Sequence, residues 1–150
     1  MESTRVDSPF LAIERTYPVA PEKVWRAWTD PEALKRWWMP RPDHRVSLAE
    51  LDVRVGGRFR IVFGGPDGAE NEAAGEYLEV EDNRRLVFTW HWPRSTPERV
   101  SRVAITFLPV AGGTELAFRH DRFHDQAAAD NHKRGWTAAL GKLDEYIQSL

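Results

Sequence analysis

Apolar and polar residues alternate with a period of two through the middle of the chain, and this pattern limits the fold more than any other feature. In residues 59–63, 85–92 and 103–107, every second residue is large and apolar. Such alternation is typical of strands that bury one face. Glycine, proline and aspartate signals such as GGPDG at 64–68 separate these segments by short intervals, which favours hairpins. We therefore expect six consecutive antiparallel strands between residues 46 and 120.

The boundaries of these strands are predicted from where the alternation stops. Residues 46–55 alternate throughout, so Val55 is expected to share a face with the apolar residues before it. Gly56-Gly57 is expected to form the next turn. Residues 75–80 read as a further strand, and residues 93–98 as a polar loop that contains proline.

A strand and two short helices are predicted ahead of these six strands. Residues 10–17 read as the strand. Pro21 followed by glutamate, and Asp30 followed by proline, are both typical helix starts. We expect the second helix to contain Trp37 and Trp38. Neighbouring helical residues point in different directions, so only one of these two indoles is expected to face the interior.

The end of the chain is predicted to be one long helix that begins after the capping residue Asp125. One face of it carries residues at steps of three and four: His132, Trp136, Leu140, Leu143 and Ile147. An antiparallel sheet covered on one face by this helix is an α+β fold. We expect a single domain over residues 1–150, with residues 1–8 as a flexible head.

Composition excludes several classes of function. The 21 basic and 23 acidic residues give a net charge of −2, so nucleic acid is not an expected partner. The chain has no cysteine, which removes disulfides, thiolate metal sites and cysteine nucleophiles. No spacing of histidines and carboxylates predicts a metal site, and no phosphate-binding or dinucleotide-binding motif predicts a cofactor.

Location is predicted from two features that the sequence lacks. No apolar run approaches the roughly 20 residues of a membrane-spanning helix. The first ten residues do not combine a basic start with an apolar stretch, which is the pattern of a secretory signal. We therefore expect a cytoplasmic protein with no membrane partner.

Six segments, in this order, resemble a known family: APEKVWRAWTDPEALKRWW (20–38), DVRVGGRF (52–59), GEYLEV (75–80), RRLVFTW (84–90), TFLPVAGGTEL (106–116) and NHKRGWTAALGKLDEY (131–146). They are similar to the START-like (SRPBCC, helix-grip) superfamily. Within it they most resemble small bacterial members of the family named for the activator of the heat shock protein 90 ATPase. The resemblance implies a curved antiparallel sheet wrapped around the long C-terminal helix.

The resemblance also implies an elongated apolar cavity between sheet and helix that holds a hydrophobic or aromatic small molecule. Seven tryptophans and seven phenylalanines provide side chains for such a cavity. The candidate lining residues are Trp37, Trp38, Phe59, Ile61, Phe63, Tyr77, Phe88, Trp90, Phe118, His120, His132, Trp136 and Leu140. The alternative is that these side chains simply pack against one another and fill the core.

Two further functions remain open from the sequence. The first is an enzyme of the cyclase, dehydratase or hydrolase type that uses the same cavity, for which His120, His132 and Tyr77 are the only candidate catalytic residues. The second is a protein-interaction or chaperone-regulating domain. A chaperone is not the expected partner, because the resemblance covers only one domain of the co-chaperone that names the family. A homodimer through a sheet edge or helix face also remains open.

Overall fold

The computed structural model describes residues 8–39 and 41–150, so residues 1–7 of the expected flexible head lie outside the described residues. The helices are α1 (Pro21–Thr29), α2 (Pro31–Lys35) and α3 (Gln126–Gln148). The strands are β1 (Leu11–Tyr17), β2 (Arg45–Leu51), β3 (Arg58–Gly64), β4 (Glu70–Glu81), β5 (Arg85–Trp92), β6 (Thr96–Val110) and β7 (Gly113–Asp121). The predicted order of one strand, two short helices, six strands and a long helix is confirmed.

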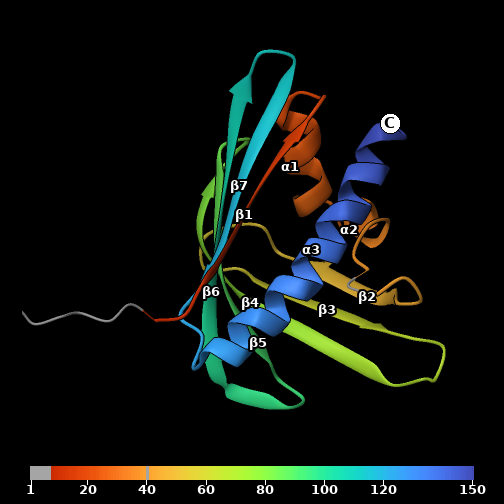
Figure 1. Cartoon of the computed structure of the whole chain (residues 1–150), viewed down its shortest axis with the longest axis vertical. Coiled ribbons are helices and arrows are strands. Elements are labelled where there is room, and N and C mark those ends of the chain that lie inside the picture. The colour runs from red at the N-terminus through yellow and green to blue at the C-terminus, as the bar shows by residue number, and fades with distance from the viewer. Residues whose placement is uncertain (1–7, 40) are drawn as a thin grey trace, which may run out of the picture.

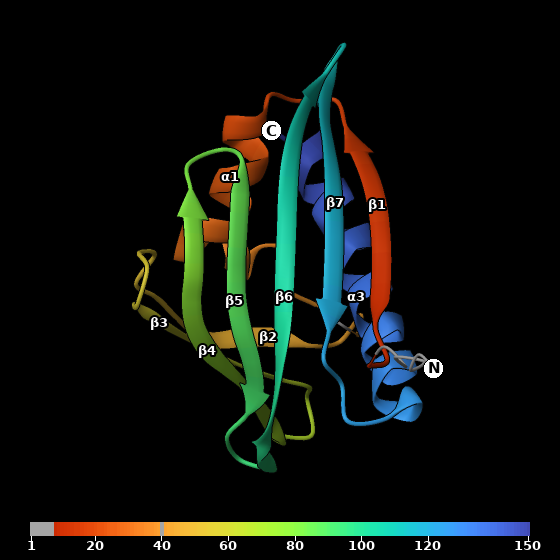
Figure 2. The same cartoon turned by 90° about the vertical axis from the view of Figure 1, so that its left-hand side faces the viewer.

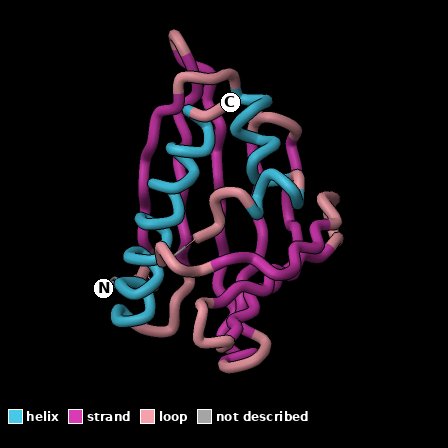
Figure 3. The backbone as a smooth tube through the Cα atoms, turned by 90° about the vertical axis from the view of Figure 1, so that its right-hand side faces the viewer, coloured by secondary structure: helices cyan, strands magenta, loops and turns pink. Residues whose placement is uncertain are grey.

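The seven strands form one antiparallel sheet in the order β1-β7-β6-β5-β4-β3-β2. Figure 1 shows the sheet curling, with β2 and β3 turned away from the direction of β1, β6 and β7 so that they reach around the helices. All three helices lie on the concave face (Figure 3), and the opposite face carries none of them (Figure 2). The predicted α+β helix-grip architecture is confirmed.

A glycine in β4 allows close contact between strands where the sheet curls. A Cβ atom on Gly75 would lie 1.9 Å from the carbonyl oxygen of Thr89 and 2.7 Å from Cε1 of Phe59. No side chain fits at those distances. Nearby, the register shifts between Tyr77 and Glu79, and such a bulge increases the local twist. The sequence therefore provides both the missing side chain and the extra residue that a curled sheet needs.

The two tryptophans after α2 differ from the prediction. The helix ends at Lys35, and the chain then leaves it through a turn in which the backbone N–H of Trp37 and that of Trp38 both donate to the carbonyl of Leu34. Both indoles are buried, and Trp37 Nε1 donates to the carbonyl of Ala27 at 2.9 Å. The prediction that only one ring faces the interior was wrong because the residues are not helical.

Two strand boundaries also differ from the prediction. Strand β2 ends at Leu51, and Val55 is 64% exposed instead of sharing a buried face. The reason is a compact loop in which Arg54 Nε donates to both carboxylate oxygens of Asp52 at 3.0 and 2.9 Å, and in which Gly56 has a φ of +85°. The loop predicted for 93–98 is shorter, because β6 already begins at Thr96.

The start of α3 and its buried face agree with the sequence prediction. Asp125 accepts a hydrogen bond from the backbone N–H of Ala128 at 2.8 Å, as a capping residue does. Apart from the half-buried His132, every residue of the predicted face is buried. None of the helices in the described ranges is long and apolar enough to cross a membrane.

Candidate functional site

An open cleft of about 710 Å³ lies between α3 and the curled half of the sheet. Its lining residues are Trp38, Arg41, His44, Phe63, Asn71, Trp90, Trp92, Asn131, His132, Arg134, Gly135, Trp136 and Ala139. They come from the α2–β2 connection, from β3, β4 and β5, and from the first half of α3. We call this space the main cleft. Large aromatic rings form its buried walls, and polar side chains complete its lining.

A second cleft, of about 470 Å³, lies beside the first N-terminal turns of α3. It shares Trp90, Trp92, Asn131 and His132 with the main cleft. Trp92 Nε1 donates to His132 Nε2 at 3.0 Å, which joins β5 to α3. The Trp92–His132 pair is therefore a common wall of the two clefts.

The hydrogen bonds of His132 fix its protonation. Because Nε2 accepts from Trp92, the ring proton lies on Nδ1, which donates to the carbonyl of Ala128 at 2.8 Å. Burial lowers the pKa of His132 below 6.5; the bond to Ala128 opposes this shift, and the nearby His124 adds to it. His132 is therefore a neutral ring that uses both nitrogens within the protein.

His120 lies behind the main cleft and is fully buried. Its Nδ1 accepts from Trp136 Nε1 at 3.0 Å, so its Nε2 carries the proton and donates to Ser101 Oγ at 2.7 Å. Ser101 in turn donates to the carbonyl of Trp90. Burial holds the pKa of His120 well below 6.5, and repulsion from His132 in its protonated form lowers it further. This chain of hydrogen bonds ties α3 to β5, β6 and β7.

The two histidines predict a pH dependence of stability. In the unfolded chain both titrate near 6.5, whereas in the folded chain their pKa values are lower. Below about pH 6.5 the unfolded state therefore binds protons that the folded state does not, and the free energy of unfolding falls as the pH decreases. Urea unfolding at about pH 7.5 and about pH 5.5 measures this loss. We expect the free energy of unfolding to fall less between these two pH values in His120→Gln than in the wild type. An equal fall in the variant and the wild type would contradict the lowered pKa of His120.

The interior beside the main cleft is almost completely filled. The space enclosed by Phe59, Ile61, Tyr77, Phe88 and their neighbours is about 10 Å³, the lower limit for one water molecule. Burial, with a smaller contribution from Asp52, raises the pKa of the Tyr77 phenol. At this end of the sheet the aromatic side chains pack against one another, as the filled-core alternative expects.

The structure thus divides the predicted cavity residues into three groups. Trp38, Phe63, Trp90, His132 and Trp136 line the main cleft. Phe59, Ile61, Tyr77 and Phe88 surround the small internal space. Trp37, Phe118, His120 and Leu140 are buried in the core and line neither cleft.

The three candidate catalytic residues do not form one cluster. The rings of His120 and His132 are 5.2 Å apart, but Tyr77 packs on Phe59 and Phe88 at 5.7 and 6.0 Å. In the ranges 8–39 and 41–150, the structure contains no group of three or more side chains that could hold a metal ion.

Sequence reasoning missed the polar part of the main cleft. Arg41 and His44 lie in a connection with no periodicity, and Asn71 lies in a part of β4 that the pattern did not predict. The only usable signal was on the helix, where Asn131 and Arg134 flank the predicted buried position of His132.

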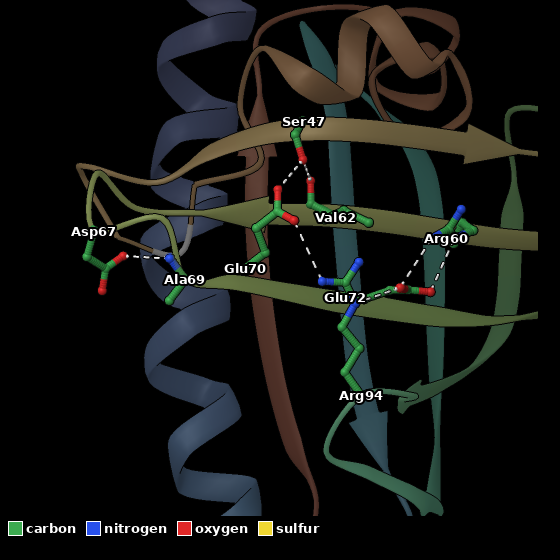
Figure 4. Close-up of polar contacts among 8 residues, drawn as sticks. All are labelled: Ser47, Arg60, Val62, Asp67, Ala69, Glu70, Glu72 and Arg94. Carbon is green, nitrogen blue, oxygen red and sulfur yellow. Dashed lines mark hydrogen bonds and ion pairs between the residues drawn. The ribbon is translucent and has the colours of Figure 1, made fainter.

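The convex face of β2, β3 and β4 carries a separate polar network (Figure 4). Arg60 Nε and Arg94 Nε approach opposite oxygens of Glu72 at 3.2 and 3.1 Å, and Arg94 also approaches Glu70 at 3.6 Å. The hydrogen bond from Arg60 is the main reason why the pKa of Glu72 is lowered. The arginines are more than 40% exposed, so each pair contributes little to stability.

Comparison with known proteins supports the same architecture. A structure from Chromobacterium violaceum has a TM-score of 0.84 and 27% identity, over 92% of this chain and 96% of that one. An AHSA1 protein from Silicibacter pomeroyi has a TM-score of 0.82 and 28% identity, over 93% and 97% of the two chains.

Sequence comparison identifies a mouse relative and a family. The mouse protein, "Activator of 90 kDa heat shock protein ATPase homolog 2", is 25% identical over 115 residues, which are 75% of this chain. The chain spans only 30% of the mouse protein's length. The profile of the family described as "Activator of Hsp90 ATPase homolog 1-like protein" matches residues 18–148. Because that match covers most of the chain, the protein belongs to the Activator of Hsp90 ATPase homolog 1-like family.

Proposed function

We propose that the protein binds a hydrophobic or aromatic small molecule in the main cleft. The observation that carries this proposal is a space of about 710 Å³ with walls of Trp38, Phe63, Trp90, Trp92 and Trp136. Small-molecule sites typically have volumes of about 300 to 1,000 Å³ and predominantly apolar linings. Burial of apolar surface against these rings would supply most of the affinity.

The walls of the cleft are held in place before any ligand arrives. Trp38 packs on Trp136 with ring centroids 5.3 Å apart, and Trp90 packs on Trp92 at 5.4 Å. The hydrogen bond from Trp92 to His132 fixes the far wall. A preformed site loses less conformational entropy when it binds a ligand, which supports a binding role.

The protonation of the histidines also supports binding over acid–base chemistry. Both nitrogens of His120 and both nitrogens of His132 form hydrogen bonds within the protein. A general base needs a free nitrogen within reach of the substrate. The two candidate catalytic histidines therefore have no nitrogen free to act on a substrate, and this favours a binding role.

A substitution that fills the cleft tests the proposal. Asn131 is an exposed residue of α3 that lines both clefts, so Asn131→Trp places an indole in the binding space with little cost to folding. With the neutral fluorescent probe N-phenyl-1-naphthylamine we expect saturable binding to the wild type. We expect the affinity to fall by about tenfold or more in Asn131→Trp, because bulk at the site excludes the probe.

Thr137→Trp is the matched control for this experiment. Thr137 is also uncharged, exposed and on α3, but it lines neither cleft. Its substitution adds the same ring and is expected to leave probe affinity unchanged. Equal affinities for the two variants would place the probe elsewhere, and the absence of saturable binding to the wild type would contradict the proposal.

A further inference from the structure

The polar lining of the main cleft is unbalanced in charge. It contains two arginines, Arg41 and Arg134, and no aspartate or glutamate. Both arginines are exposed, whereas the tryptophans Trp38 and Trp136 are buried. The positive charge therefore lies at the solvent side of an apolar space.

Neither of these arginines is neutralised within the described residues. Among residues 8–39 and 41–150, no carboxylate lies within ion-pair distance of either guanidinium. Arg134 instead donates a hydrogen bond to the side-chain oxygen of Asn131, another residue of the cleft. By contrast, Arg60 and Arg94 on the convex face are paired with acids (Figure 4).

Three polar atoms in residues of the lining have no hydrogen-bond partner among the described residues, but they are closed off from the cleft. The Nε1 atoms of Trp38 and Trp90 are buried and have no hydrogen-bond partner among the described residues. An indole N–H can only donate, and an unpartnered buried donor costs free energy. His44 Nδ1, from a third residue of the lining, is also without a partner within the described chain. Because protein atoms cover all three, a ligand in the cleft would not reach them, and the preference for an anion rests on Arg41 and Arg134.

We infer that the ligand of the main cleft is an organic anion with an apolar ring body. The ring body packs on the tryptophans, and the anionic group lies at the side of Arg41 and Arg134. This inference rests on the proposed function and specifies its ligand class. A guanidinium binds an oxyanion through charge-assisted hydrogen bonds, and the absence of acids from the lining removes the repulsion that such a ligand would meet.

A pair of probes that share a ring framework tests this inference. The probe 1-anilinonaphthalene-8-sulfonate carries a sulfonate, and N-phenyl-1-naphthylamine is the same framework without it. Both are titrated against the wild type, Arg41→Gln, Arg134→Gln and the double variant. We expect the double variant to bind the sulfonate probe about tenfold more weakly, with a smaller loss at high salt because exposed charges are screened. Affinity for the neutral probe is expected to change by less than about twofold, because its contacts are apolar.

Arg26→Gln is the control for a simple change in net charge. Arg26 is exposed, lies on α1 and pairs with Asp30, away from the cleft lining, so its substitution is expected to change neither affinity. If the double variant keeps full affinity for the sulfonate probe while the neutral probe still saturates, the inference is wrong and the proposed function stands. If neither probe saturates with the wild type, both are wrong.

Discussion

Replacement of Trp136 with alanine is expected to lower the free energy of unfolding by about 4 kcal/mol. Trp136 lies where α3 meets the sheet, and its ring centroid is 4.5 Å from that of Phe118 and 5.2 Å from that of Trp90. Alanine would leave a large cavity and would also remove the donor to His120 Nδ1. Urea unfolding of the wild type and the variant measures the difference.

Trp136→Phe separates the two contributions. Phenylalanine keeps an aromatic ring in the core but cannot donate to the buried His120, and an unpaired buried acceptor costs about 1 to 3 kcal/mol. The phenylalanine variant is therefore expected to lie between the wild type and Trp136→Ala. A cost below about 1.5 kcal/mol for Trp136→Ala would contradict the account, because core tryptophans contribute more than that.

Gly75→Ala is expected to destabilise the protein by about 2 to 3 kcal/mol or more, because an overpacked site must move its neighbours. The new methyl group would lie 1.9 Å from a backbone oxygen of Thr89. Backbone in the middle of a sheet cannot rotate away as a flexible side chain can. Thermal or urea unfolding of the variant measures the loss.

The same substitution at Gly141 provides the opposite result as a control. Gly141 lies within α3, and a Cβ atom there would meet nothing within 4 Å. Since alanine is the better helix former, Gly141→Ala is expected to stabilise the protein by about 0.5 to 1 kcal/mol. If Gly75→Ala were as stable as the wild type or more stable, crowding would not be what limits position 75.

The sheet and the long helix could be predicted because their patterns are local. Alternation placed Phe59, Ile61 and Phe63 on the buried face of β3, and the structure confirms this. Asp125 marked the start of α3 in the same way. In an element that is buried on one side, each residue is apolar or polar according to the side it faces, so the sequence alone shows the pattern.

The errors arose where tertiary contacts override local pattern. Val55 continues the alternation of β2, but the pairing of Arg54 with Asp52 turns the chain away. Trp37 and Trp38 are both buried in the core because α2 ends at Lys35, before either residue. Neither of these two differences could be predicted from the hydrophobic periodicity of the sequence.

For a related reason, the sequence predicted only the aromatic part of the candidate site and missed its polar part. Its aromatic walls, such as Trp90 and Trp136, belong to periodic elements and were predicted as lining. Arg41 and His44 belong to an irregular connection, and the tertiary fold places them in the lining of the cleft together with Phe63 of β3 and Trp136 of α3. The sequence also could not distinguish the open cleft from the filled interior around Tyr77, since both are lined by aromatic residues.

Native mass spectrometry of the gently purified protein tests the central claim most directly, with the bound compound released and identified. The account predicts a discrete non-covalent adduct on the wild type, an organic compound with an apolar body, which is lost in Asn131→Trp and retained in Thr137→Trp. The contrary result is a wild-type chain that has only its own mass and gives no saturable response to either naphthalene probe. That result would mean that the tryptophans of the cleft serve the packing of the core and that the cleft holds no small molecule. It would favour the alternative of a protein-interaction domain.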